Sequence, residues 1–379
     1  MKIVIAIDSF KGSLTSLQAG SAAAEGIARV YPEAKTEIFP IADGGEGTVI
    51  ALTTALQGKL QTVEALDPLG RPIACEYGIL PNQTAVIEMS CAAGITLLKP
   101  EERNPMHTTT YGVGQVIADA ISKGCRDFIV GIGGSATNDG GIGMLQALGF
   151  GILDDGGNPV PFGGAGLEKI ATITTENALR SLKDCTFHIA CDVTNPLCGK
   201  DGCSAIYGPQ KGATPEQIQQ MDAWLGAYAD KVKAVFPDSD KNTAGAGAAG
   251  GIGFAFFSFL NGKPYSGIDL ILGEMPIERS IRDADLVITG EGRLDDQTVM
   301  GKAPIGIARI AKKYNLPVLA FSGCVTPKTS VCNSHGIDAF FPIVKGACTL
   351  EQAMDVENAY PNMADTVEQA FRLLKMAKF

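Results

Sequence analysis

The sequence is poor in the residues that metal centres and disulfide frameworks require. Its 379 residues include only 3 histidines and 10 cysteines, and no two of the cysteines form a C-x-x-C pair. The histidines, His107, His188 and His335, lie far apart in the chain. Neither a zinc-binding pattern nor a disulfide framework is therefore expected, and the scattered single cysteines indicate a reduced, cytoplasmic protein.

Clustered positive charge and long apolar runs are also missing. The net charge is -10 and no helix or stripe gathers the basic residues, which argues against nucleic acid or an anionic membrane as a partner. The longest apolar stretch, residues 246–260, is shorter than the roughly 20 residues of a membrane span and contains four glycines. We expect a glycine-rich turn leading into a buried helix there, and a small molecule as the partner.

The signatures of the two large kinase classes are absent as well. The sequence contains neither the G-x-x-x-x-G-K-[ST] loop nor the H-R-D and D-F-G segments of protein kinases. Any phosphate-binding site must therefore be built from other loops.

What the sequence does contain is the alternation of short apolar runs with helical patterns that is typical of parallel strands joined by crossover helices. Lys2–Ile7 and Thr36–Ile41 are predicted strands, whereas residues 59–89 show strands separated by turns, the pattern of antiparallel hairpins. We predict a doubly wound, Rossmann-like parallel-sheet domain with an inserted mixed α/β domain and an active site in the cleft between them. The first domain would comprise residues 1–58 and 267–379, and the second residues 59–266.

A glycine-rich loop follows the apolar run DFIV. Gly131, Gly133 and Ala136 match the G-x-G-x-x-G/A dinucleotide fingerprint. In a dinucleotide-binding unit, however, the helix would already run where this chain has Asn-Asp-Gly-Gly, and glycine costs about 1 kcal/mol inside a helix. We therefore expect the helix to start near Gly140 or later. Asp139 would repel a bare pyrophosphate, whereas a phosphate bound with a divalent cation would accommodate it.

Polar segments follow six of the predicted strands: DSFKGS, ADGGEGT, GGSATNDGG, CDVTNP, GEGRLDDQT and SGC. Each alone is more often an ordinary turn or helix cap. In open α/β sheets, however, ligands bind outside the carboxyl ends of strands, so these segments would converge if their strands are neighbours. The carboxylates they supply are Asp8, Asp43, Glu46, Asp139, Asp192, Glu291 and Asp295.

Carboxylates gathered at one site repel one another unless a cation lies among them, so the collection predicts Mg²⁺. Acidic groups, exposed backbone N–H groups and a few lysines or arginines suit phosphoryl transfer, in which catalysis is mostly positioning and charge neutralisation. The residues alone thus indicate Mg²⁺-dependent phosphoryl transfer to a small molecule. An NAD-dependent dehydrogenase of a small hydroxy acid and a non-catalytic sugar-acid-binding protein are the alternatives.

Eight segments in order, DSFKGS, ADGGEGT, GGSATNDGG, CDVTNPLCG, GPQKGA, GAGAAGG, GEGRLDDQT and GKAPIGIA, give the chain its resemblance to the type I glycerate kinase family, from Asp8 to Ala308. The resemblance implies phosphorylation of D-glycerate from ATP with Mg²⁺. Bacterial members usually make 2-phosphoglycerate, which feeds glycolysis from glucarate, galactarate or glyoxylate breakdown. The 3-hydroxyl as acceptor and a homodimeric assembly are left open.

Residue type and loop position then suggest roles. Arg293 would bind the glycerate carboxylate bidentately, and Asp192 would take the proton of the attacking hydroxyl, with Asp139 as the alternative. Lys11 and Lys211 would neutralise the transferring phosphoryl group.

The remaining assignments complete the expected site. The expected metal ligands are Asp43, Glu46, Glu291 and Asp295. Further substrate contacts are expected from Asp8, Ser9, Asn195 and Gln297. Nucleotide binding is expected from Gly133, Gly134, Ser135, Thr137, Asn138, Lys211, Gly290 and Lys302.

Overall fold

The computed structural model describes residues 1–376 and divides the chain into two compact units. Unit 1 contains Met1–Asp43, Ile50–Leu56 and the chain from Gly267 onward, and unit 2 contains Gly44–Val49 and Gln57–Ser266. The chain therefore leaves unit 1 and later returns to it. None of the helices in residues 1–376 combines the length and apolar character needed to cross a membrane.

Unit 1 is built on a five-stranded, wholly parallel sheet with the order β13-β12-β11-β1-β2. Its strands are β1 (Lys2–Ile7), β2 (Lys35–Ile38), β11 (Leu286–Leu294), β12 (Val318–Val325) and β13 (Ala339–Pro342). This is the doubly wound order, and the winding direction reverses between β1 and β11. The predicted fold class is confirmed, although β2 ends at Ile38 rather than Ile41, ahead of Pro40, which has no N–H to donate to a ladder.

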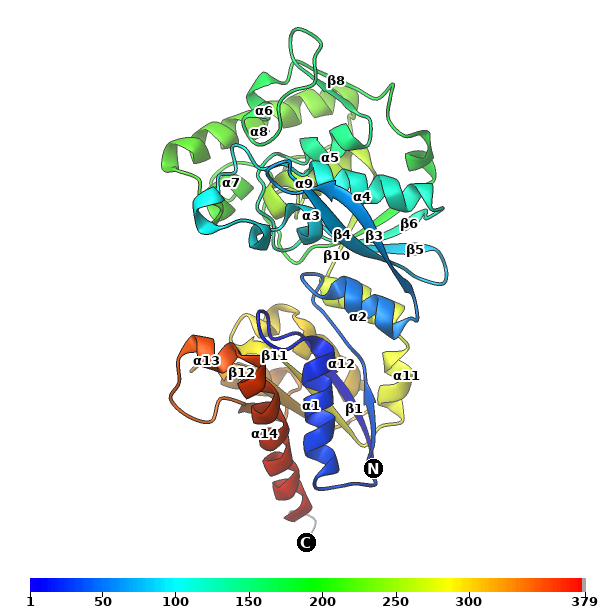
Figure 1. Ribbon diagram of the computed structural model, residues 1–379, viewed down its shortest axis with the longest axis vertical. Coiled ribbons are helices and arrows are strands. Elements are labelled where there is room, and N and C mark those ends of the chain that lie inside the picture. Colours follow the sequence, from blue (N-terminus) through cyan, green and yellow to red (C-terminus); the bar gives the residue numbers. More distant parts are fainter. Residues whose placement is uncertain (377–379) are drawn as a thin grey trace. The chain divides into compact units, whose positions relative to one another are not determined.

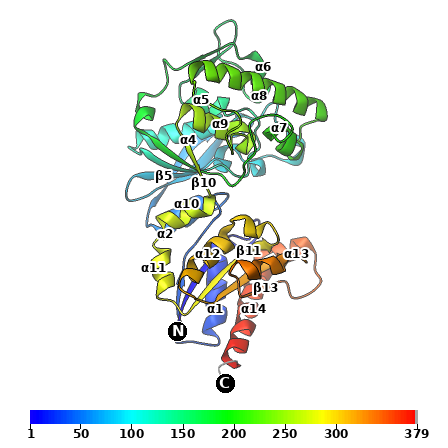
Figure 2. The same ribbon diagram turned by 180° about the vertical axis from the view of Figure 1, so that it is seen from behind.

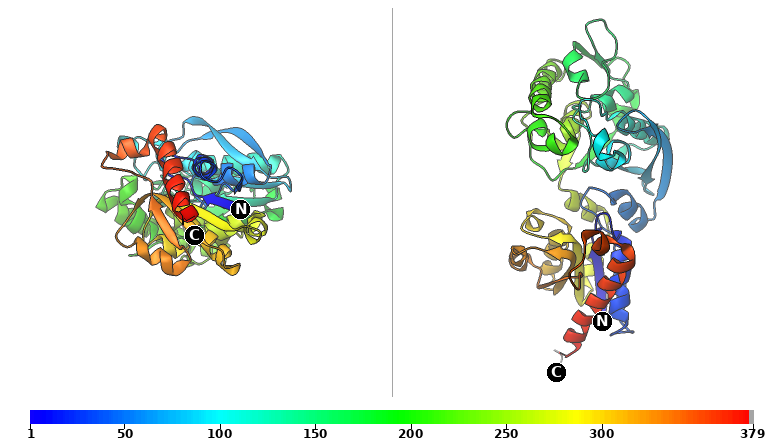
Figure 3. Two further views of the ribbon diagram at one scale, coloured as in Figure 1. Left: turned by 90° about the horizontal axis from the view of Figure 1, so that it is seen from below. Right: turned by 60° about the vertical axis from the view of Figure 1, so that its left-hand side comes forward.

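Helices cover both faces of this sheet. Ile3 and Ile5 of β1 share a core with α1 (Ser16–Ala28) and α14 (Val356–Met376), which lie side by side in Figures 1 and 3. α12 (Ala303–Lys313) covers the opposite face in Figure 2. The other helices that lie wholly or mainly in unit 1 are α2 (Thr48–Ala55), α10 (Gly267–Glu274), α11 (Ile277–Arg282) and α13 (Leu350–Met354).

Unit 2 contains a six-stranded mixed sheet with the order β10-β9-β6-β5-β4-β3. Its strands are β3 (Lys59–Leu66), β4 (Pro72–Ile79), β5 (Thr84–Glu88), β6 (Asp127–Gly131), β9 (Thr186–Ala190) and β10 (Lys263–Tyr265). The pairs β3–β4 and β4–β5 are antiparallel, which confirms the hairpins predicted for residues 59–89. The pairs β5–β6, β6–β9 and β9–β10 are parallel, so these four strands end at the same edge of the sheet. β7 (Gly151–Leu153) and β8 (Thr172–Thr174) form a separate antiparallel pair.

The helices of unit 2 also bear on two of the predictions. They are α3 (Ser90–Ala93), α4 (Tyr111–Ser122), α5 (Ile142–Ala147), α6 (Gly166–Lys169), α7 (Cys203–Tyr207), α8 (Pro215–Val235) and α9 (Ala248–Phe259). α5 begins at Ile142, after Gly140 and Gly141 in the left-handed region, as the loop composition predicts. Within α9, Gly250 and Gly251 also have positive φ, and the buried helix follows them.

Candidate active site

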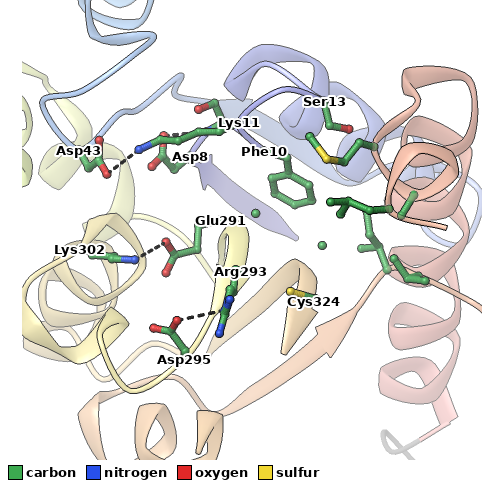
Figure 4. A pocket seen from close by; sticks show the side chains of 18 residues that line it. Asp8, Phe10, Lys11, Ser13, Asp43, Glu291, Arg293, Asp295, Lys302 and Cys324 are labelled. Carbon is green, nitrogen blue, oxygen red and sulfur yellow. Dashed lines mark hydrogen bonds and ion pairs between the residues drawn. The ribbon is translucent and has the colours of Figure 1, made fainter. Parts of the chain in front are cut away.

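A cavity of about 440 Å³ lies in unit 1 at the carboxyl ends of β1, β11 and β12, where the winding of the sheet reverses (Figure 4). This is where ligands bind in open α/β sheets. The predicted site residues that line it are Asp8, Ser9, Lys11, Asp43, Glu291, Arg293, Asp295 and Lys302. Gly290 lies next to the cavity in β11, where its carbonyl accepts the backbone N–H of Asp8 at 2.9 Å. The structure thus brings nine of the predicted residues to one place.

Asp8 follows β1 directly and is only 3% exposed. Its Oδ1 accepts the backbone N–H of Ser9 at 2.6 Å. Burial, and then the negative charge of Asp43, raise the pKa of Asp8 to about 8, against the lowering effect of Lys11. Near neutral pH this carboxyl group is therefore poised to gain or lose a proton.

Three cationic side chains each lie beside a carboxylate of the cavity. Lys11 Nζ is 3.3 Å from Asp43 Oδ2, and Lys302 Nζ is 3.5 Å from Glu291 Oε2. Arg293 Nε is 3.2 Å from Asp295 Oδ2, and 65% of the Arg293 side chain is exposed. The cavity therefore combines donors for an anionic ligand with acceptors for a cation.

Thr298 also contributes to this arrangement, and it is not among the residues predicted from the sequence. Its hydroxyl donates to Glu291 Oε1 at 2.7 Å and accepts the backbone N–H of Asp295 at 3.1 Å. Burial raises the pKa of Glu291, while Lys302 and this hydroxyl lower it. The D-x-x-T spacing from Asp295 to Thr298, a common turn pattern, was the available signal.

The cavity has the donor set that Mg²⁺ prefers, which is a small number of carboxylate oxygens completed by phosphate and water oxygens. Asp43 and Glu291 are close enough to Asp8 for their negative charges to raise its pKa. Within residues 1–376, no group of three or more His, Cys, Asp or Glu side chains could hold a metal ion by itself. The residues therefore fit a magnesium ion that is bound jointly by the protein and a phosphorylated ligand. They fit an ion held by protein side chains alone less well.

The glycine-rich loop between β6 and α5 forms a second polar cluster, in unit 2. Lys211, only 2% exposed, donates from Nζ to Ser135 Oγ at 2.8 Å and to the Thr137 carbonyl at 2.6 Å. Burial lowers the pKa of Lys211 to about 8. Asn138 is buried and donates from Nδ2 to Ser204 Oγ at 2.8 Å. The predicted residues Gly133 and Gly134 belong to the same loop.

Asp139 is turned into the fold and has no exposed surface. Its Oδ2 accepts the backbone N–H and the hydroxyl of Thr110, at 2.9 and 2.8 Å, and the N–H of Gly143 at 3.4 Å. Its Oδ1 accepts the N–H of Gly141 at 3.0 Å. We expected this carboxylate at the loop surface, in contact with a metal or a substrate hydroxyl. It lies inside the fold instead, because these four N–H and O–H donors hold it there.

The other predicted residues lie at loop surfaces or serve as local braces. Asp192 follows β9 and is exposed, as are Glu46 in unit 2 and Gln297 in unit 1. Asn195 donates from Nδ2 to the Asp201 carbonyl at 2.9 Å and accepts the Tyr207 hydroxyl at 2.7 Å. These contacts hold the loop after β9 in shape.

Glu88 is a second residue that was not predicted from the sequence. It ends β5, beside Gly131 at the end of β6, and its Oε1 accepts the backbone N–H of Val49 at 2.7 Å. Burial raises its pKa. The signal was an acidic residue at the end of the buried run TAVI, and this carboxylate fixes the segment that follows Asp43.

Comparison with known proteins gives concordant results. A family model described as "Glycerate kinase family" matches residues 3–375. A glycerate kinase of Haemophilus influenzae is 46% identical over 375 residues, which cover 99% of each chain. A glycerate 2-kinase of Escherichia coli is 44% identical over 364 residues, covering 96% of this chain and 95% of its own. A crystal structure described as glycerate kinase 2 from Salmonella typhimurium matches with a TM-score of 0.89 and 44% identity, covering 100% of this chain and 99% of that one.

Proposed function

The chain belongs to the glycerate kinase family, and we propose that it catalyses the ATP-dependent phosphorylation of D-glycerate. The observation that carries this proposal is the cavity at the reversal point of the unit 1 sheet, where Lys11, Arg293 and Lys302 lie beside carboxylates. Such a set can bind an anionic acceptor and a metal-bound phosphate chain together. A dehydrogenase would have no use for this density of acidic groups.

We further propose 2-phospho-D-glycerate as the product, feeding glycolysis from glucarate, galactarate or glyoxylate breakdown in the cytoplasm. The Escherichia coli relative, named a glycerate 2-kinase, supports this choice of hydroxyl.

In the proposed mechanism, charge is neutralised at the cavity of unit 1. Asp43 and Glu291 would hold Mg²⁺ with phosphate oxygens, and the ion would offset the charge of the transferring phosphoryl group. Lys302 occupies the N-cap position of α12, whose N-terminal N–H groups and dipole favour a phosphate. Lys11 supplies a second positive charge on the β1 side.

Arg293 is proposed to bind the carboxylate of glycerate. Its ion pair with Asp295 orients the guanidinium group, and most of the side chain is accessible to a ligand. Asp192 is proposed as the base for the attacking hydroxyl, because its carboxylate is exposed at the end of β9. For Asp139 we propose a different role from catalysis, which is to hold the loop between β6 and α5 in shape.

The test is ADP formation from Mg-ATP with D-glycerate, followed by identification of the product. Enolase should consume the product directly if it is 2-phosphoglycerate, whereas the 3-phosphate requires phosphoglycerate mutase first. Glycerate-dependent ADP formation with direct consumption by enolase supports both proposals. Absence of ADP overturns the kinase, and a requirement for the mutase overturns the choice of hydroxyl.

A further inference from the structure

The unit 1 cavity has an apolar side that glycerate cannot use. Phe10, Ile343, Val344, Leu350 and Met354 line it together with the charged groups. Figure 4 shows Phe10 on the side of the cavity away from Lys302. Glycerate carries a carboxylate and two hydroxyls and has no apolar face, whereas a cavity of about 440 Å³ can hold a much larger molecule. A second ligand group with an apolar surface is needed to fill it.

Two glycines also line the cavity with their backbone, Gly292 of β11 and Gly323 of β12. Packing explains Gly323, because a Cβ there would lie 2.6 Å from the carbonyl oxygen of Gly292. Packing does not explain Gly292, where a Cβ would meet nothing closer than the Cα of Phe10 at 3.4 Å, an ordinary contact. Gly292 also lacks a positive φ. A glycine inside a strand often marks a place where a ligand or another backbone approaches closely. The backbone of Phe10 and Lys11 leaves room for a Cβ at Gly292, at 3.4–3.8 Å, so a close approach by a ligand is the remaining reason for a glycine there.

The apolar wall is built into the fold. α13, which carries Leu350 and Met354, begins with a capping box formed by Thr349 and Gln352. Met354 packs against the loop after β1, since a Cβ at Gly12 would lie 2.7 Å from its Cε. The wall is therefore held in place before a ligand arrives, which lowers the entropic cost of binding.

We propose that this apolar side is the nucleobase subsite. The adenine ring of ATP lies over the backbone of Gly292, against Phe10 and Met354, and the triphosphate extends toward Lys11 and Lys302. The order of surfaces, apolar and then cationic with carboxylates for a metal, matches the order of groups along Mg-ATP. The inference rests on the proposed function, because it takes ATP as the phosphoryl donor.

The first test is Gly292→Val, which places a side chain in the cavity. We expect the KM for ATP to rise at least tenfold, while the KM for D-glycerate changes less than twofold. Gly273→Val is the matched control, because a Cβ at Gly273 meets nothing within 4 Å. Should Gly292→Val fail to fold, Gly292→Ala, whose Cβ the structure accommodates, is expected to raise the KM for ATP at least threefold.

The second test separates the base from the phosphates. Calorimetry with adenosine and with magnesium tripolyphosphate is carried out on the wild type and on the Gly292 variant. We expect the variant to bind adenosine at least tenfold more weakly and tripolyphosphate equally well. A wild type that phosphorylates glycerate, together with a folded Gly292 variant whose KM for ATP stays within twofold, overturns the subsite. Gly292-dependent adenosine binding without glycerate-dependent ADP formation overturns the proposed function and leaves the subsite standing.

Discussion

Asp8 lies where three influences on a single carboxyl group meet. The sheet buries it, Asp43 places a negative charge near it, and Lys11 offsets only part of the effect. An isolated aspartate in water is ionised near pH 4, and this one titrates at about pH 8. Perturbation of this kind is concentrated at functional sites, because burial of an acid among other acids is retained where chemistry needs it.

The cost of burying Asp8 gives a stability prediction. Its folded-state pKa lies above the ordinary value of 3.8, so the stability it contributes is complete below about pH 4 and is lost as the pH rises to 8. Asp8→Asn should therefore raise the free energy of unfolding by about 1–3 kcal/mol at pH 8 and change it little at pH 4. Urea unfolding at both pH values measures this. Exposed Asp155→Asn is the control and should be neutral at both; equal effects of Asp8→Asn at pH 4 and 8 would contradict the burial argument.

The proposed base can be tested at one position. Asp192→Asn should lower kcat by about 10²–10⁴-fold while the KM for ATP changes less than twofold, because only proton transfer is removed. Asp201→Asn, an exposed carboxylate in the same loop, is the matched control and should leave kcat unchanged. Steady-state kinetics decide, and near-normal turnover of Asp192→Asn excludes it as the base.

The role proposed for Arg293 predicts an effect on the KM for D-glycerate rather than on the KM for ATP. Lysine keeps the charge but cannot form the bidentate contact, so Arg293→Lys should raise the KM for D-glycerate about tenfold with little change in the KM for ATP. Arg309→Lys on α12, which replaces another exposed, ion-paired arginine, should change neither constant. A raised KM for ATP with an unchanged KM for glycerate would reassign Arg293 to the nucleotide.

At the scale of elements, the sites follow from where strands end. The polar runs after β1 and at the carboxyl end of β11 are visible in the sequence because glycine and acidic residues interrupt the apolar pattern there. They predict Asp8, Glu291 and Asp295 at one edge of the sheet. The direction of Asp139 could not be predicted in this way. It depends on Thr110, 29 residues away, and an Asn-Asp-Gly-Gly turn alone is compatible with either orientation. Local pattern locates a loop, and distant partners decide which way its side chains point.

The loop between β6 and α5 carries its own prediction. Asp139→Asn replaces a carboxylate that accepts four hydrogen bonds with an amide whose NH₂ would face donors, so the urea midpoint should fall by the equivalent of about 2–4 kcal/mol. Asp154→Asn is the control. Its Oδ1 accepts the backbone N–H groups of Gly156 and Asn158, and the asparagine side chain retains this oxygen as an acceptor. This variant should cost less than about 1 kcal/mol. Equal costs for the two variants would show that the Asp139 contacts do not hold the loop.

At the scale of the whole molecule, the two units repeat one design. In each, neighbouring parallel strands end in polar loops, and in each a lysine makes its contacts among them, Lys302 in unit 1 and Lys211 in unit 2. The ten cysteines are all unbridged, so packing and hydrogen bonds, without disulfides, hold the described residues together. A ligand that binds the folded protein should therefore raise its free energy of unfolding measurably.

Mg-ATP at about 100 times its Kd should stabilise the protein by ~2.7 kcal/mol, a rise in melting temperature of about 3 °C for a chain of 379 residues. NAD should give no shift. EDTA should reduce the effect of ATP, because the carboxylates of the cavity would then face the triphosphate without a cation. Differential scanning fluorimetry measures all three arms. A shift with NAD and none with Mg-ATP would favour the dehydrogenase instead.

The pairing of Ile7 with Gly290 joins residues 283 positions apart (290 − 7), and it has a consequence for biosynthesis. β1 leaves the ribosome long before β11 is synthesised. Until then, the backbone N–H and C=O groups of β1 that pair with β11 have no strand partner. All of unit 2 is available to fold during that interval, because domains generally fold in the order of synthesis. The cavity that contains Asp8 and Glu291 can form only when the last quarter of the chain has left the exit tunnel.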